Sequence, residues 1–90
     1  MNSVKGIVKE ETWRALRLGN IPEHWQTEDI LQVFDRKGEV ESIRFQGRFH
    51  AIVTYVEHAG AAKGIQLNST CPMDAEEPVT VEIAHGQPEQ

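Results

Sequence analysis

The sequence predicts an α+β fold in which one four-stranded antiparallel sheet carries two helices on one of its faces. The main evidence is that the hydrophobic period switches between strand-like and helix-like in the order strand, helix, strand, strand, helix, strand. A chain of 90 residues has room for one modest core and no second domain. Its composition, 39% apolar and 26% charged, is close to the average for globular domains, so we expect the chain to fold.

The first strand is predicted over residues 13–20, where Leu16 and Leu18 share one side of an alternating pattern. Arg17 lies on the opposite side of the same strand. Pro22 follows shortly afterwards and ends the strand, because proline has no backbone N–H to donate.

A helix is predicted between Thr27 and Gly38. Thr27 stands at the expected N-cap, and Glu28 and Asp29 follow in the first turn, where carboxylates complement the helix dipole. Gly38 provides the C-terminal stop. The apolar stripe of this helix consists of Ile30, Leu31, Val33 and Phe34.

The second and third strands are predicted over 40–46 and 49–55, as an antiparallel hairpin with a tight turn at Gln46-Gly47. Apolar and polar residues alternate along both segments. The side chains expected to face the core are Ile43, Phe45, Phe49, Ala51, Val53 and Tyr55.

A second helix is predicted over 57–67, although Gly60 and Gly64 each cost about 1 kcal/mol relative to alanine in a helix interior. A loop at 68–78 contains two prolines, and the last strand is predicted over 79–84. The residues expected to face the core are Ala59, Ala62 and Ile65 from the helix and Val81 and Ile83 from the strand.

These elements together make the ferredoxin-like βαββαβ arrangement. Because both helices cover one face of the sheet, the residues that alternate away from the core are displayed together on the other, open face. These residues are Arg17, Ser42, Arg44, Gln46, His50, Ile52, Thr54, Thr80 and Glu82.

The chain is interpreted as one folded unit with short flanks. Residues 1–11 form a lead-in or accessory segment, residues 12–85 the domain and residues 86–90 a C-terminal tail. Cys71 has no partner for a disulfide, and no segment resembles a signal peptide or approaches the roughly 18 apolar residues of a membrane span. We therefore expect an intracellular location, in the nucleus or the cytoplasm, and no membrane partner.

The net charge is minus five, from nine basic and 14 acidic residues, which argues against a strong non-specific nucleic-acid binder. The charge is unevenly distributed, however. Over residues 12–20, 42–55 and 79–84, four arginines oppose Glu82 alone, so the local formal charge is plus three. The sequence thus permits a small basic face with acidic flanks.

Two segments resemble the motifs of a known family, the RNA recognition motif. Leu16-Arg17-Leu18-Gly19-Asn20-Ile21 resembles its hexapeptide motif, and residues 48–55 resemble its octapeptide motif. Residues 27–40 match the family's first helix and its exit. The resemblance covers about residues 13–84 and implies binding of single-stranded RNA, as a module of a larger protein.

The sequence departs from the family at the three sites that usually carry base-stacking aromatic rings. Here these sites hold Arg17, His50 and Ile52. Phe49 stands where the family usually has glycine, and the hairpin is too short to supply a long RNA-gripping loop. The resemblance therefore implies the family's scaffold with an incomplete stacking surface.

The candidate RNA-binding residues are Arg17, Asn20, Arg44, Arg48, His50 and Ile52. Arg17 and His50 are expected to stack on bases or bond to them, and Arg44 and Arg48 to position phosphates. The alternative is that these are solvated residues on a sheet face that binds nothing. Ile52 stacks poorly on a base and fits a protein partner better.

The second functional hypothesis is therefore protein binding, either to a partner or to another copy of the chain, with little or no RNA affinity. An acidic first helix is compatible with it, but we interpret that helix as a solvated face. Trp13 either extends the stacking surface or packs against the lead-in segment. Trp25 is interpreted as a packing residue at the start of the first helix.

No enzyme, metal site or cofactor is expected. The four histidines, at positions 24, 50, 58 and 85, fall at no metal-ligand spacing, and no serine or cysteine has the context of a nucleophile.

Overall fold

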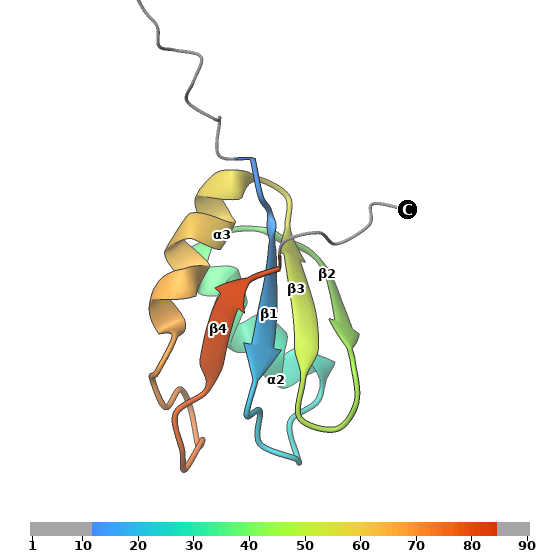
Figure 1. Ribbon diagram of the computed structural model, residues 1–90, viewed down its shortest axis with the longest axis vertical. Coiled ribbons are helices and arrows are strands. Elements are labelled where there is room, and N and C mark those ends of the chain that lie inside the picture. The colour runs from blue at the N-terminus through green and yellow to red at the C-terminus, as the bar shows by residue number, and fades with distance from the viewer. Residues whose placement is uncertain (1–11, 85–90) are drawn as a thin grey trace, which may run out of the picture.

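The computed structural model describes residues 12–84, which contain one four-stranded sheet. The strands are β1 (Ala15–Gly19), β2 (Val40–Phe45), β3 (Ala51–Tyr55) and β4 (Thr80–Ile83), and the helices are α2 (Thr27–Phe34) and α3 (His58–Gly64). Figure 1 shows α2 and α3 on the same side of this sheet. Short 3-10 helices extend α2 over Asp35–Lys37 and α3 over Ile65–Leu67. None of the helices in residues 12–84 is long and apolar enough to cross a membrane.

The strand order is β2-β3-β1-β4, and every neighbouring pair is antiparallel. The predicted βαββαβ arrangement is confirmed. Because β1 and β3 are the two central strands, they carry the middle of the open face. The backbone N–H of Ala84 donates to the carbonyl of Ala15 at 3.0 Å, so the end of β4 lies beside the start of β1.

The core lies between the sheet and the helices, where the apolar halves of both periodic patterns meet. Leu16, Val53 and Tyr55 from the central strands and Ile30 and Phe34 from α2 are almost completely buried. Burying each side chain of this size contributes about 1.5–3 kcal/mol relative to leaving it exposed. The predicted core face of the sheet is therefore correct over β1, β3 and β4.

Helix α2 begins one residue before the predicted position. Its N-cap is Gln26, whose backbone N–H donates to the Asp29 carboxylate at 2.8 Å. Thr27 is the first helical residue, so its prediction as the cap is wrong. The Asp29 carboxylate at the third helical position satisfies an amide that the helix leaves unpaired, which makes the earlier start favourable.

Helix α3 buries its glycines, and its predicted core face is correct for Ile65, which packs against the core, but not for Ala59. Gly60, Ala61 and Gly64 are buried, whereas Ala59 is exposed. A Cβ on Gly60 would lie 2.6 Å from Cδ2 of Tyr55, and one on Gly64 would lie 2.8 Å from the Tyr55 hydroxyl. The glycines thus let α3 approach a buried aromatic ring, and this contact determines which side of the helix faces inward.

The hairpin between β2 and β3 is wider than predicted. Residues 46–50 form the loop, which the N–H of Gln46 closes by donating to the carbonyl of His50 at 2.8 Å. Gly47 has φ of +90°, a conformation that favours glycine. Phe49 therefore precedes β3 and is 42% exposed, so its predicted place in the core is wrong.

Candidate nucleic-acid interface

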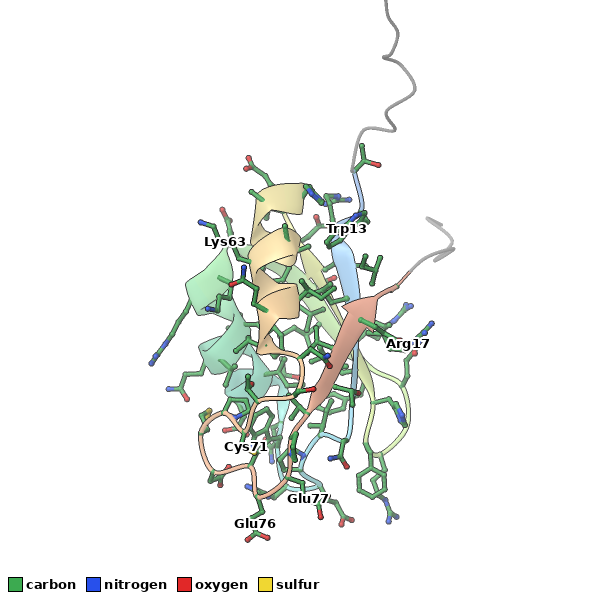
Figure 2. All side chains as sticks on the ribbon, turned by 60° about the vertical axis from the view of Figure 1, so that its left-hand side comes forward. Trp13, Arg17, Lys63, Cys71, Glu76 and Glu77 are labelled. Carbon is green, nitrogen blue, oxygen red and sulfur yellow. The ribbon has the colours of Figure 1, made fainter. Side chains whose placement is uncertain are left out.

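The open face of the sheet is built from rows of residues, one from each strand, that stand side by side across it. The middle row is Glu82, Arg17, Ile52 and Arg44, in the order β4, β1, β3, β2. On one side of it, Ala15 pairs with Thr54, which pairs with Ser42. Figure 2 shows Arg17 on the side of the sheet away from the helices. Three of the predicted contact residues therefore form one continuous line.

Ile52 lies in the centre of this line and is only 5% exposed. Its cross-strand neighbours are Arg17 and Arg44, and long arginine side chains cover apolar surface with their stems while their charged ends stay in water. Ile52 also stands apart from the main hydrophobic cluster. It therefore forms the floor of the face and offers a ligand little surface, although the sequence predicts it as displayed.

Three of the four arginines on the strands and hairpin are paired with carboxylates. Arg17 Nη1 lies 3.2 Å from Glu82 Oε2, Arg14 Nη1 lies 2.8 Å from Glu41 Oε1, and Arg48 Nη1 lies 3.5 Å from Glu23 Oε2. The local charge of plus three holds for the residues counted, but Glu41 and Glu23 lie outside them and pair with Arg14 and Arg48. In the described part of the chain, Arg44 makes no ion pair.

His50 stands next to Gly19 at one end of the face. A Cβ on Gly19 would lie 2.5 Å from Oγ1 of Thr80 and 3.4 Å from Cδ2 of His50. The missing side chain thus makes room for these two polar side chains over β1. His50 is exposed, so its ring is accessible to a ligand beside the middle row.

The RNA recognition motif profile matches residues 16–76, which is more than half of the chain. The chain belongs to the RNA recognition motif family. Domains of this family (RRMs) typically bind RNA, and the family is not one of enzymes. None of the curated proteins compared with the chain matches it significantly.

Solved RRM structures have the same fold. The RRM domain of S. pombe Puf1 is 25% identical, with a TM-score of 0.72 over 82% of this chain and 97% of that one. An RNA complex of the SXL-lethal protein is 22% identical, with a TM-score of 0.75 over 86% of this chain and 52% of that one. The Rna15 RRM with bound RNA (GU) is 18% identical, with a TM-score of 0.70 over 81% and 84%.

Asn20 directly follows β1 of this RRM and has a left-handed conformation, with φ of +57°. Asparagine tolerates this conformation better than most residues. Its side-chain nitrogen donates to the carbonyl of Pro78 at 2.7 Å. Asn20 thus links the end of β1 to the segment before β4, and its amide nitrogen is already used within the protein.

The hairpin end of this RRM is acidic. A pocket of about 460 Å³ is lined there by residues that include Phe49, Glu23, Asp74, Glu76 and Glu77. Figure 2 shows Glu76 and Glu77 at the end of the molecule far from Trp13. Arg48 lies at this end, paired with Glu23 and with its guanidinium 5.9 Å from the centre of the Phe49 ring. Its surroundings are therefore less favourable to phosphate than the sequence suggests.

Trp25 packs into the core, as predicted, and joins two loops. Its Nε1 donates to Asp74 Oδ1 at 2.9 Å, and His24 Nε2 lies 2.8 Å from Asp74 Oδ2. The hydrogen bonds from Trp25 and His24 lower the pKa of the Asp74 carboxyl. Asp74 thus fixes the loop before α2 to the loop before β4.

Trp13 lies beside the start of α3 and is not part of the open face. Its ring contacts that of His58 edge to face, with centroids 4.4 Å apart. Nδ1 of His58 donates to the carbonyl of Trp13 at 2.8 Å. Trp13 also packs partly against the core, so the alternative in which it extends the stacking surface is wrong.

Among residues 12–84, no group of three or more histidine, cysteine, aspartate or glutamate side chains could hold a metal ion. Sequence reasoning missed the ion pairs of Arg14 and Arg48 with glutamates, the burial of Ile52 and the exposure of Phe49. Each depends on contacts between segments that lie far apart in the chain, and no local pattern signals them.

Proposed function

We propose that this RRM is a single-stranded RNA-binding module of a larger protein, with residues 12–85 as the folded unit and the open sheet face as the binding surface. The observation that supports this most is the middle row, in which Arg17 and Arg44 flank Ile52 on the face that no helix covers. His50 adds an accessible ring beside this row. Guanidinium and imidazole groups can both stack on bases and bond to phosphate.

The lack of aromatic rings and the paired charges on this face imply a modest affinity for RNA. Stacking on a good aromatic ring contributes about 1–3 kcal/mol per base, and the middle row has no aromatic ring. Glu82 partly neutralises Arg17, and the hairpin end is acidic. Among the arginines on the described strands, Arg44 is therefore the one whose charge is available to attract phosphate. Asn20 and Arg48 contribute at the edge of the surface.

An NMR titration of the labelled full chain with short single-stranded RNA pools tests this proposal. We expect shifts of amides in β1, β2 and β3 that disappear at high salt, because phosphate contacts release counterions. Arg44→Ala should reduce the shifts. Arg36→Ala, which removes an exposed arginine after α2, is the matched control and should not. Shifts confined to α2 and α3, or none with any pool, would refute RNA binding by this face.

A protein partner remains the second candidate function, and one observation favours it. Phe49 is 42% exposed beside the acidic pocket, where a single large aromatic side chain is suited to anchor a partner. The burial of Ile52, in contrast, removes the apolar side chain that first suggested protein binding. Sedimentation of the chain at several concentrations tests self-association. A chain that stays monomeric at every concentration, and whose sedimentation Phe49→Ser does not change, would count against self-association.

A further inference from the structure

The two arginines of the middle row differ in one respect that bears on how each would meet RNA. Both lie directly beside Ile52, one on β1 and one on β2. Arg17 is held by Glu82, whereas Arg44 makes no ion pair in the described part of the chain. Both arginines thus adjoin Ile52, Arg17 from a central strand and Arg44 from an edge strand, but a carboxylate neutralises only Arg17.

A phosphate approaching Arg17 meets a guanidinium whose charge is already balanced. Glu82 Oε2 lies 3.2 Å from Arg17 Nη1, and the Glu82 side chain is 64% exposed on the same face. A phosphate group must therefore either displace this carboxylate or bind beside it, against like-charge repulsion. Arg44 imposes neither cost.

A nucleic-acid base meets a different situation at Arg17. A base carries no net charge, so it does not compete with Glu82 for the guanidinium. The guanidinium is planar and donates its hydrogen bonds within its plane, which leaves its two faces available for stacking. The contact with Glu82 engages an edge of the group and leaves 41% of the Arg17 side chain exposed.

We propose that Glu82 is a positioning residue that reserves Arg17 as a stacking surface for a base, while Arg44 alone in the middle row takes a phosphate. This division of roles rests on the proposed RNA-binding function and specifies how that surface works. Its structural basis is one ion pair between the edge strand β4 and the central strand β1.

Two substitutions of Arg17 separate stacking from charge. Arg17→Tyr supplies a stacking ring without charge, and Arg17→Lys supplies charge without a stacking plane. We expect Arg17→Tyr to bind RNA within about two-fold of wild type or more tightly. We expect Arg17→Lys to lose at least about five-fold, the lower end of what one stacked base contributes.

Glu82→Gln tests the positioning role directly, since glutamine keeps the length and one oxygen but not the charge. Releasing Arg17 to bind phosphate should steepen the salt dependence of binding by about 0.7 in the slope of log K against log salt concentration, the increment for one more phosphate contact on a single strand. Glu41→Gln, which removes the carboxylate that pairs with Arg14 outside the middle row, is the matched control and should leave that slope unchanged.

The measurement is fluorescence anisotropy of a labelled eight-nucleotide RNA pool over a salt series, with the fold of each full-chain variant checked by amide NMR spectra. If Arg17→Lys binds RNA tightly and Arg17→Tyr loses affinity, the inference is overturned, although RNA binding by this face is not. An unchanged salt slope in folded Glu82→Gln would do the same. Absence of binding by the wild-type chain would refute the proposed function, and this inference with it.

Discussion

Replacing Gly60 by alanine should destabilise this domain, although the same change in an exposed helix stabilises by about 1 kcal/mol. The added Cβ would lie 2.6 Å from Cδ2 and 3.1 Å from Cγ of Tyr55, and 3.2 Å from Cα of Gly38. Tyr55 cannot move easily, because it is fully buried and its hydroxyl donates to the carbonyl of Phe34 at 2.7 Å. Carbon atoms at rest are about 3.5–4.0 Å apart, so α3 must retreat by roughly 1 Å.

The expected magnitude follows from two opposing effects. Inserting a carbon into a filled site costs about 1–3 kcal/mol. The better helix propensity of alanine offsets about 1 kcal/mol of this. We therefore expect Gly60→Ala to lower the free energy of unfolding by about 1 kcal/mol, which corresponds to a fall in Tm of about 4–8 °C for a domain of this size.

Chemical denaturation followed by tryptophan fluorescence measures this change, since Trp25 is buried in the native state. The control is the reverse exchange at the neighbouring exposed position, Ala59→Gly, which should cost about 1 kcal/mol through propensity alone. Glycine should thus be preferred at position 60 and alanine at position 59. A Gly60→Ala variant as stable as wild type, or more stable, would show that the approach of α3 to Tyr55 does not require glycine.

Three further predictions concern charge. Arg44→Ala should reduce the slope of log K against log salt concentration for single-stranded RNA by about 0.7, and Arg36→Ala should not, as binding over a salt series would reveal. Burial, reinforced by a nearby carboxylate, raises the pKa of the Tyr55 hydroxyl above its unfolded value of 10.0, so the unfolded state loses the hydroxyl proton at lower pH than the folded state. The free energy of unfolding should therefore fall by about 1.4 kcal/mol per pH unit above pH 10. Tyr55→Phe should lack this loss of stability in alkaline unfolding. Hydrogen bonds lower the pKa of Asp74 below 3.8, so its stabilising effect is present above that pH and lost as the pH falls below it; acid unfolding of Asp74→Asn should be less steep.

The hydrophobic periods were sufficient to predict the order of the elements and the core face of β1, β3 and β4. They were insufficient for α3, because a periodic pattern counts glycine as neither apolar nor polar. Gly60 and Gly64 lie inward because a ring on β3 occupies the space that side chains would fill. That ring belongs to Tyr55, on another element, so its effect on the helix is not local information.

In the candidate site too, the local pattern predicts some features, and contacts between distant segments determine the others. The alternation along β1, β2 and β3 correctly predicts that Arg17, Ile52 and Arg44 face away from the core. It does not predict how far each is exposed or what charge each presents. Those properties depend on neighbours in adjacent strands and loops, and they become visible only with the register of the sheet.

The hydrogen bond between Ala84 and Ala15 has a consequence for larger architectures. It places the end of β4 beside the start of β1, at the end of the sheet opposite the hairpin loop (Figure 1). The described chain thus enters the sheet and leaves it through neighbouring strands at one end. Such a unit can be inserted into a surface loop of a host protein, or repeated in tandem, without a long linker spanning it.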